Sequence, residues 1–300
     1  MSVILVVFIV ATATFILMRM IPGGPFKREK ALTPEIQRNI EARYRLNDPL
    51  WKQYVDYMGN LIRGDFGPSF KYRGRSVNDI IAEGFPVSAK LGGLAILFAL
   101  VVGIPAGIIS ALNQNKWPDN AVMAIAIIGV SVPSFVMATL LMYFFAVKLR
   151  WLPAAMWGEP KHVILPMLAL SGFPAAFFAR LMRSSTLDVL SQDYIRTARS
   201  KGLSWAAVVY KHVVKNAILP VVTYLGSLVA GVLTGSFVVE NIFAIPGLGK
   251  YYVTSIYNRD YTTIMGVTIF YATLLVFLNF LVDIAYGWID PRIKLTGAKE

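Results

Sequence analysis

Long apolar runs with almost no charge constrain this chain more than any other feature of its sequence. The stretch 87–112, for example, contains a single charged residue, Lys90. A membrane-spanning helix needs about 20 mainly apolar residues, because lipid offers no partner to charged side chains. Charged residues make up 15% of the chain, against roughly 25% in soluble domains. We therefore predict an integral membrane protein.

The pattern predicts an all-α protein with six transmembrane helices. They are expected at about 3–20, 87–112, 121–147, 162–182, 214–239 and 263–286. The corresponding domains are a first helix at 1–21, an extracytoplasmic helical segment at 22–86, a five-helix core at 87–290 and a tail at 291–300. The first 20 residues lack the basic start and the small-residue cleavage site of a signal peptide, so we interpret them as a retained span.

The charges of the loops predict the orientation. The loop 183–215 carries six Lys or Arg residues against Asp188 and Asp193, whereas the short loops expected on the opposite side carry less net charge. Basic loops favour the cytoplasmic side. With six spans, both termini are then cytoplasmic. The segment 22–86 then lies outside. Its basic residues do not count strongly against this, because loops longer than about 60 residues escape the charge rule.

The segment 22–86 carries signals for helices. Thr33-Pro34-Glu35 is typical of a helix start, and Asp48-Pro49 begins a second helix that stops at Gly64. Ser76 with Asp79 resembles a capping box. We predict a small helical cap on the outer surface.

The sequence argues against an enzyme. There is no cysteine, which excludes disulfides, thiolate metal sites and a cysteine nucleophile. The motifs H-E-x-x-H, G-x-S-x-G and G-x-x-x-x-G-K-[ST] are missing, and the phosphate-loop fragment at 246–250 lacks the upstream glycine. His162 and His212 lie at opposite ends of the expected fold and cannot form a dyad. Energy for any active process must therefore come from another subunit.

Some polar residues and glycines within the spans have two interpretations. Glu240, Asn279 and Asp283 are candidates for a transport path or an outer vestibule, because polar groups at membrane depth are often functional. The structural alternative is that Glu240 caps a loop and Asp283 is interfacial. The pairs Gly103/Gly107 and Gly231/Gly235 have the spacing of close helix packing, or of contacts that let a path open and close.

The loop between the fourth and fifth spans predicts a helical elbow at 184–213. Leu187, Leu190, Tyr194 and Ala198 recur at helical spacing on one face. Gly202 ends this helix, and Ser204 can cap a second one. Such an elbow either projects into the cytoplasm toward a partner or lies on lipid headgroups.

At these residues the chain resembles a known family. Ala198-x-x-x-Gly202 and its flanks resemble the coupling loop of permease subunits in binding-protein-dependent ABC importers. In the general family pattern, Glu and Ala occupy the places of Arg196 and Thr197, and the Leu-Pro pair comes five residues earlier. The variant at 194–203, followed by His212 and by Asn216-Ala217-x-Leu219-Pro220, is similar to the peptide/nickel subfamily.

Further motifs extend the resemblance over nearly the whole chain. The segments 64–69, 239–249, 258–261 and 290–293 resemble the same subfamily. Met20-Ile21-Pro22-Gly23-Gly24-Pro25-Phe26 and the stretch 66–72 are similar to the first permease subunit of oligopeptide importers. Relatives usually begin with a short basic stretch before the first span, which this chain lacks.

The resemblance implies a multi-pass subunit of a peptide (oligopeptide or dipeptide) importer in the bacterial cytoplasmic (inner) membrane. The implied partners are a homologous second permease, two cytoplasmic ATPase subunits that bind ATP and Mg, and an extracytoplasmic peptide-binding protein. It implies no cofactor on this chain and no nucleic acid. The residues implied to couple to the ATPases are Asp193, Tyr194, Ile195, Arg196, Thr197, Ala198, Arg199, Lys201, Gly202 and Leu203.

Several hypotheses remain beside this one. Within the same class, the subunit could serve a nickel importer. A stand-alone channel or a proton-coupled carrier would need carboxylates or histidines within the spans, which are few here. A membrane-embedded enzyme is the weakest hypothesis. The helices between Thr33 and Phe85 are further expected to dock the binding protein or to shape the outer vestibule.

Overall fold

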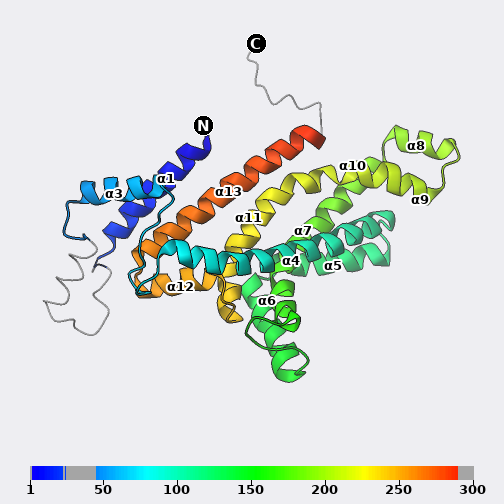
Figure 1. Cartoon of the computed structure of the whole chain (residues 1–300). Coiled ribbons are helices and arrows are strands. Elements are labelled where there is room, and N and C mark those ends of the chain that lie inside the picture. Colours follow the sequence, from blue (N-terminus) through cyan, green and yellow to red (C-terminus); the bar gives the residue numbers. More distant parts are fainter. Residues whose placement is uncertain (1, 23, 25–44, 290–300) are drawn as a thin grey trace, which may run out of the picture. The chain divides into compact units, whose positions relative to one another are not determined.

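The computed structural model describes residues 2–22, 24 and 45–289. Throughout these ranges the regular elements are helices, apart from one isolated β-bridge between Pro68 and Ser76 (Figure 1). The helices are α1 (Ser2–Met20), α3 (Leu50–Ile62), α4 (Val77–Leu112), α5 (Trp117–Ser131), α6 (Ser134–Leu141), the π-helix η1 (Met142–Lys148), α7 (Pro160–Leu190), α8 (Asp193–Ser200), α9 (Trp205–Val208), the π-helix η2 (Val209–Val214), α10 (Lys215–Ala217), α11 (Leu219–Ile242), α12 (Leu248–Asn258) and α13 (Tyr261–Ile289).

The chain divides into two compact units. The first comprises Met1–Ser88 and Ile245–Val276, and the second comprises Ala89–Ala244 and Phe277–Glu300. The first unit holds α1, α3, α12 and the N-terminal parts of α4 and α13. The second unit holds α5 through α11 with the remaining parts of α4 and α13.

Within the described residues, three helices are long and apolar enough to cross a membrane. These are Val77–Leu112, Pro160–Leu190 and the part Tyr261–Leu281 of α13. Two bent pairs, Trp117–Ser131 with Ser134–Lys148 and Trp205–Ala217 with Leu219–Leu233, raise the number to five if each pair counts as one span. The apolar part of α1, Ile4–Met20, is shorter. The all-α membrane architecture is thus as expected, and the count of six spans stays a prediction.

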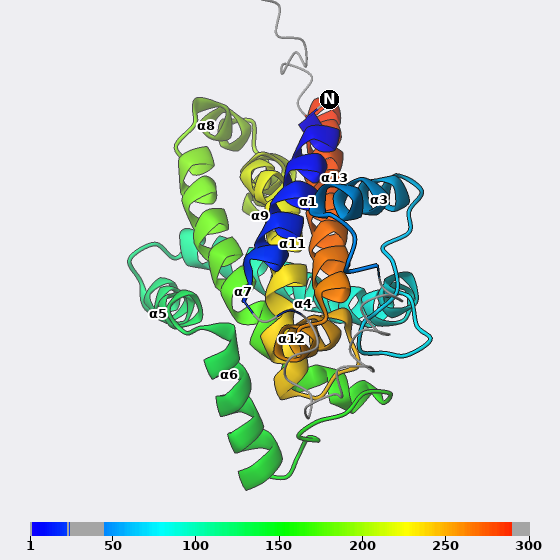
Figure 2. The ribbon, with the colours of Figure 1, turned by 90° about the vertical axis from the view of Figure 1, so that its left-hand side faces the viewer.

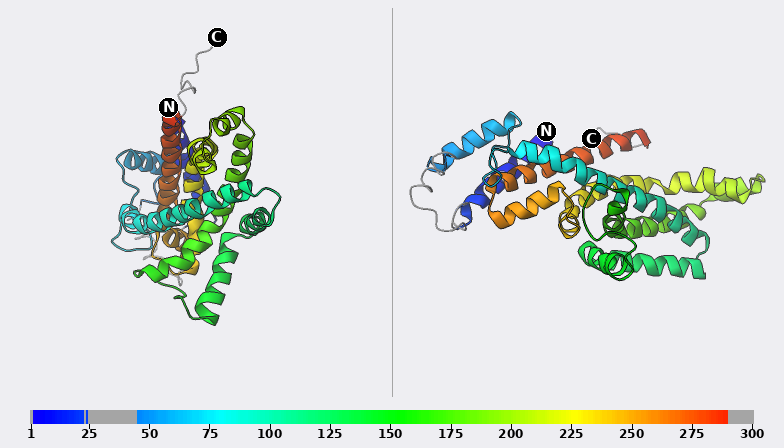
Figure 3. Two further views of the ribbon diagram at one scale, coloured as in Figure 1. Left: turned by 90° about the vertical axis from the view of Figure 1, so that its right-hand side faces the viewer. Right: turned by 60° about the horizontal axis from the view of Figure 1, so that its bottom comes forward.

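The expectation of one continuous helix across 121–147 is wrong. The chain leaves the helix at Val132, which is extended (φ −89°, ψ 119°), and α6 departs from α5 at 106° (Figures 2 and 3). The cause is Pro133, which has no N–H and pushes the residue before it out of the α region. The carbonyl of Gly129 therefore lacks the N–H donor that a continuous helix would supply four residues later.

A second expected helix, 214–239, is also divided. A bend of 47° separates α10 from α11 at Ile218, and Pro220 occupies the first turn of the new helix. Proline fits that position because the first N–H groups of a helix have no internal partner anyway. The span therefore begins as a separate helix rather than as a continuation of the elbow.

The capping box predicted at Ser76 is present, and it starts a longer helix than expected. Ser76 Oγ and its backbone N donate to Asp79 Oδ2 (2.7 and 2.9 Å), and Asp79 N donates back to Ser76 Oγ (3.1 Å). From this cap α4 runs without interruption to Leu112, so the expected domain boundary at 86 falls inside a helix. The helix predicted from Asp48-Pro49 is α3, whereas the one predicted at Thr33-Pro34 lies outside the described residues.

Asp260 connects the start of α13 to the loop before α4. It is fully buried, and its carboxylate accepts hydrogen bonds from Ser69 Oγ (2.5 Å), from Phe70 N (3.1 Å) and from Thr263 Oγ1 (2.8 Å). These donors satisfy a buried charge and cap the helix at once. Ser69 and Asp260 belong to two of the sequence motifs, 64–69 and 258–261, which meet here although 191 positions separate the pair.

Candidate functional site

The candidate site is an elbow formed by α8, α9 and η2 at the end of α7. Helix α7 stays continuous through Pro166 and Pro174 and stops at Ser191. Gln192 is extended (φ −74°, ψ 145°), so α8 starts in a new direction at Asp193 (Figures 1 and 2). The prediction that Leu187, Leu190, Tyr194 and Ala198 share one helical face is therefore wrong, because the helix ends between the first and second pair.

A small apolar core holds the elbow together. Ile195 and Ala198 of α8 are buried against Val208 and Val213 of the returning segment, and Val189 with Leu190 of α7 packs against the same cluster. The buried pair on α8 is thus Ile195 and Ala198, while Tyr194 faces outward. Burial of four aliphatic side chains thus packs α8 against the end of α7.

Gly202 makes the turn between α8 and α9, as predicted. Its φ is +80°, in the left-handed region that side chains disfavour. Its N–H donates to Arg199 O (3.0 Å), and that of Lys201 donates to Thr197 O (3.0 Å), which closes the C-terminus of α8. Ser204 then caps α9 by accepting from Ala207 N (3.4 Å), again as expected.

The outward face of the elbow is basic and aromatic. Arg196 and Asp193 are both exposed, and Arg196 Nη1 lies 3.7 Å from Asp193 Oδ1. Thr197 Oγ1 donates a hydrogen bond to the backbone carbonyl of Asp193 (3.0 Å). The Arg199 guanidinium carbon lies 5.1 Å from the ring centre of Trp205, within the range of a cation–π contact. The exposed members of the predicted set are Asp193, Tyr194, Arg196, Thr197, Arg199, Lys201, Gly202 and Leu203. Such a surface suits a partner groove with apolar walls and acidic groups.

Trp205 belongs to this surface and was missed in the sequence analysis. It is 46% exposed, and its ring contacts the Arg199 guanidinium. Aromatic and arginine side chains carry a large share of binding energy in protein interfaces. An aromatic residue directly after a predicted cap, inside a basic loop, is the signal that could have identified it.

Arg183 attaches the elbow-bearing helix to α5. Its Nε and Nη2 donate to the two carboxylate oxygens of Asp119 (2.6 and 2.7 Å). Asp119 is buried and also accepts from Ser110 Oγ (2.5 Å) and Asn115 N (2.9 Å). Two parallel charge-assisted bonds fix direction as well as distance. Arg183 had been counted among the loop charges, whereas α7 continues about two turns beyond it.

Two glycines bring α4 into backbone contact with α7. A Cβ at Gly103 would lie 2.6 Å from Ala175 O, and one at Gly107 would lie 2.5 Å from Ala179 O. The packing role predicted for this pair is confirmed. For the other pair, a Cβ at Gly231 would meet nothing within 4 Å. Helix α7, which carries the elbow, thus contacts α4 on one side and α5 on another.

The path candidates lie apart from the elbow in sequence and environment. Glu240 is fully buried in α11 and accepts a hydrogen bond from Ser236 Oγ (2.6 Å). Asn279 of α13 accepts a hydrogen bond from Ser227 Oγ of α11 (3.4 Å). The side chain of Asp283 lies outside the described residues. A path role for these three stays a prediction.

A hollow of about 530 Å³ lies beside the break between α5 and α6. Its lining includes Val132, Pro133 and Ser134 at the break, Pro174 of α7, and Ser227 of α11. Broken helices at membrane depth are tolerated where protein or a water-filled cavity surrounds them. The residues around this hollow are therefore further candidates for the wall of a transport path. One of them, Ser227, also donates a hydrogen bond to Asn279.

Comparison with known proteins assigns the family. The model of the family described as "Binding-protein-dependent transport system inner membrane component" matches residues 103–295. The chain belongs to this family. Among the relatives of this inner membrane component, the dipeptide transport system permease protein DppB of Bacillus subtilis (strain 168) is 52% identical over 96% of this chain and 94% of its own length. The oligopeptide transport system permease protein OppB of Haemophilus influenzae is 49% identical over the same shares.

Solved structures share the fold of this family member. An inward-facing structure of the methionine ABC transporter MetNI aligns with a TM-score of 0.56 at 20% identity, covering 72% of this chain and 97% of that chain. An amino acid ABC transporter solved with histidines aligns with a TM-score of 0.55 at 17% identity, covering 69% and 93%. The inner membrane component thus has the fold of ABC importer permeases.

Proposed function

We propose that this inner membrane component is a permease subunit of an ATP-driven peptide importer, with oligopeptides or dipeptides as substrate. The observation that carries the proposal is 52% identity, over almost the whole chain, to a dipeptide transport permease. The relatives described above are dipeptide and oligopeptide permeases, which favours peptide over nickel. Both termini lie in the cytoplasm, and ATP with Mg binds to partner subunits rather than to this chain.

The elbow is the part that receives the energy. A cytoplasmic ATPase subunit holds the outward face of α8, which offers Tyr194 and Arg196, together with Lys201 just after the helix. It moves when ATP draws two ATPases together. Because Ile195 and Ala198 pack α8 against the end of α7, the movement passes to α7. Alternating access then needs two packings that differ by only a few kcal/mol.

The translocation path forms between this chain and a homologous second permease. The hollow beside Pro133 and the polar pair Ser227–Asn279 support a path wall on this chain. Glu240 and Asp283 are the further candidates for the path or its vestibule. An extracytoplasmic peptide-binding protein delivers the substrate, so most of the choice among peptides rests with that protein.

Purification from native membrane tests the proposal. The chain should co-purify with a second permease, two ATPases and an external binding protein, and that external protein should bind peptides rather than nickel. Accumulation of peptide in liposomes should require all of these subunits and ATP. Sustained accumulation by this chain alone, or an external partner that binds nickel and no peptide, would contradict the proposal.

Cross-linking tests the assignment of the elbow separately. The chain has no cysteine, so single cysteines can be introduced without background. Arg196→Cys and Lys201→Cys should cross-link to an ATPase subunit through a short bismaleimide. Ala198→Cys is the matched control, because Ala198 is buried in the same helix. Outward cysteines that react with soluble maleimide in the assembled complex but never reach an ATPase would refute the assignment.

A further inference from the structure

Helix α3 packs against the middle of α1 through aromatic side chains. Tyr54 Oη lies 2.8 Å from Thr12 Oγ1, and the ring of Phe15 contacts those of Tyr54 and Tyr57 at 5.3 and 6.0 Å between centres. Figure 2 shows α3 meeting α1 part-way along its length. The contact therefore lies well inside α1 rather than at its end.

The position of this contact along α1 gives its depth. At a rise of about 1.5 Å per residue, the 19 residues of α1 extend about 28 Å, close to the roughly 30 Å hydrocarbon thickness of a bilayer. Thr12 precedes the last residue of α1, Met20, by about 12 Å. If α1 crosses the membrane, the side chains that hold α3 lie within the hydrocarbon layer.

One strip of α3 is apolar and has no protein cover among the described residues. Trp51, Val55 and Ile62 are 69, 58 and 84% exposed. At about 100° per residue these three positions fall within an arc of roughly 40°. The neighbouring face of α1 is also apolar and exposed, with Ile16 and Met20 as members.

A groove joins the two exposed apolar surfaces. It has a volume of about 410 Å³, and its lining includes Ile16 and Met20 of α1 with Leu50 and Trp51 of α3. The strip on α3 thus continues the exposed apolar surface of α1.

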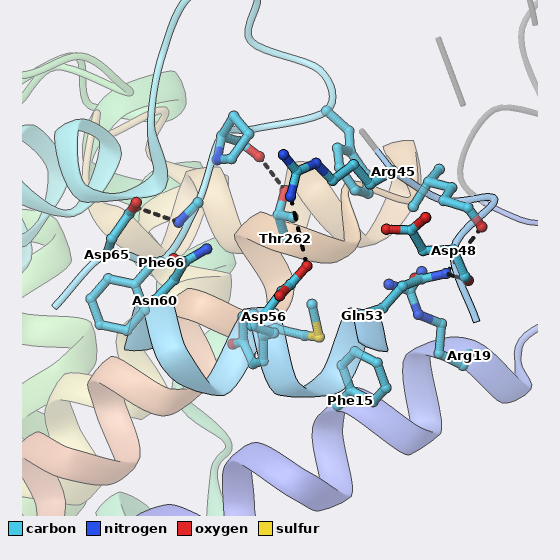
Figure 4. A pocket seen from close by; sticks show the side chains of 16 residues that line it. Phe15, Arg19, Arg45, Asp48, Gln53, Asp56, Asn60, Asp65, Phe66 and Thr262 are labelled. Carbon is cyan, nitrogen blue, oxygen red and sulfur yellow. Dashed lines mark hydrogen bonds and ion pairs between the residues drawn. The ribbon is translucent and has the colours of Figure 1, made fainter. Parts of the chain in front are cut away.

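The opposite face of α3 is polar and borders a second hollow of about 280 Å³, which shares Phe15 and Arg19 of α1 with the groove (Figure 4). Gln53, Asp56 and Asn60 line it from α3. Arg45 Nη1 lies 3.8 Å from Asp56 Oδ2, and Gln53 Nε2 donates a hydrogen bond to the backbone carbonyl of Asp48 (2.7 Å). Charged and amide groups of this kind need water or polar partners, so α3 separates a polar space from an apolar surface.

We propose that α3 is embedded in the leaflet that holds the C-terminal half of α1, with lipid acyl chains covering the strip Trp51–Val55–Ile62 and filling the groove beside α1. Amphipathic helices of this kind lie in the plane of the membrane with the apolar face buried. Depth and continuity with α1 favour acyl chains over a soluble protein. If the segment 33–85 docks the binding protein, as expected from the sequence, it must then do so through surfaces other than this strip of α3.

Spin labels on single cysteines test the proposal in the assembled complex, reconstituted in nanodiscs with its partner subunits. Val55→Cys and Ile62→Cys place labels on the strip, and Asn60→Cys places a matched label on the polar face. Collision with oxygen, which concentrates in lipid, should exceed collision with a soluble nickel chelate several-fold at the two strip positions. The ratio should reverse at Asn60→Cys.

Two outcomes would overturn the proposal. Strip labels that collide mainly with the nickel chelate would put α3 in water, as docking by an external protein requires. Strip labels shielded from both reagents would show a covering protein segment. Peptide uptake by each labelled complex in parallel proteoliposomes shows that it is assembled, and two strip positions protect the test against loss of one variant.

Discussion

Arg183 and Asp119 form two parallel hydrogen bonds that join α7 to the start of α5. Asp119 is buried, whereas the Arg183 side chain keeps 25% of its surface exposed. The pair lies about two turns before the elbow. We therefore expect the pair to limit how far the end of α7 can move relative to α5.

Replacement of Arg183 by Lys should weaken this connection although the charge remains. A lysine has no planar fork and cannot make both bonds, and the loss of one charge-assisted bond costs on the order of 1–3 kcal/mol. We expect a lower melting temperature of the purified complex and less uptake per ATP hydrolysed. Arg180→Lys, on the same helix and exposed, is the control. Equal melting temperatures of the two variants would contradict the expected role.

Gly202→Val should uncouple ATP hydrolysis from uptake. The left-handed φ of +80° costs a residue with a side chain about 1–2 kcal/mol, and a β-branched residue is especially disfavoured there, so the turn after α8 should be displaced. Gly202→Asn is the matched control, because asparagine tolerates this region. ATPase rate and peptide accumulation are measured together in proteoliposomes. Normal accumulation with unchanged ATPase turnover in Gly202→Val would refute the assignment of this turn as part of the lever.

Gly107→Ala should destabilise the second unit, and Gly93→Ala on the same helix should not. The new Cβ at position 107 would lie 2.5 Å from Ala179 O and 2.8 Å from Met182 Cβ, whereas a Cβ at position 93 would meet nothing within 4 Å. Overpacking of this kind costs about 1–3 kcal/mol. Thermal unfolding in detergent compares the two. Similar melting temperatures would show that α4 and α7 can separate without loss.

Asp260→Ala should destabilise the first unit. The change removes the acceptor of two buried donors, Ser69 Oγ and Thr263 N, and each unsatisfied buried donor costs about 1–3 kcal/mol. Faster limited proteolysis between α3 and α4 is the expected readout. Asp65→Ala is the control, because Asp65 is exposed and accepts one hydrogen bond, from Gly67 N. Identical cleavage rates in the two variants would be the contrary result.

Local features of the fold could be predicted from the sequence. The capping box at Ser76, the turn at Gly202 and the cap at Ser204 depend on residues within three or four positions of one another. Their backbone requirements are therefore visible in the sequence alone. The close approach at Gly103 and Gly107 was also predictable, because the spacing places both on one face of a helix.

Features that depend on distant partners could not be predicted in this way. Spacing alone put Tyr194 on the apolar face of the elbow, but Ile195 is buried because the returning segment supplies Val208 and Val213. Arg183 looked like a loop charge because nothing near it in sequence reveals Asp119. The break at Pro133 could not be predicted from the proline alone, because Pro166 and Pro174 lie inside α7 and leave that helix continuous.

The break at Pro133 also has a consequence for biogenesis. With no N–H at Pro133, the carbonyl of Gly129 is left without its helical donor, and a Cβ at Gly129 would lie 2.9 Å from Gly172 O of α7. The ribosome makes α5 and α6 before α7, so this stretch emerges before the neighbour that covers it exists. Lipid cannot satisfy the exposed backbone carbonyl. We therefore expect α5 and α6 to remain beside the insertion machinery until α7 has been synthesised.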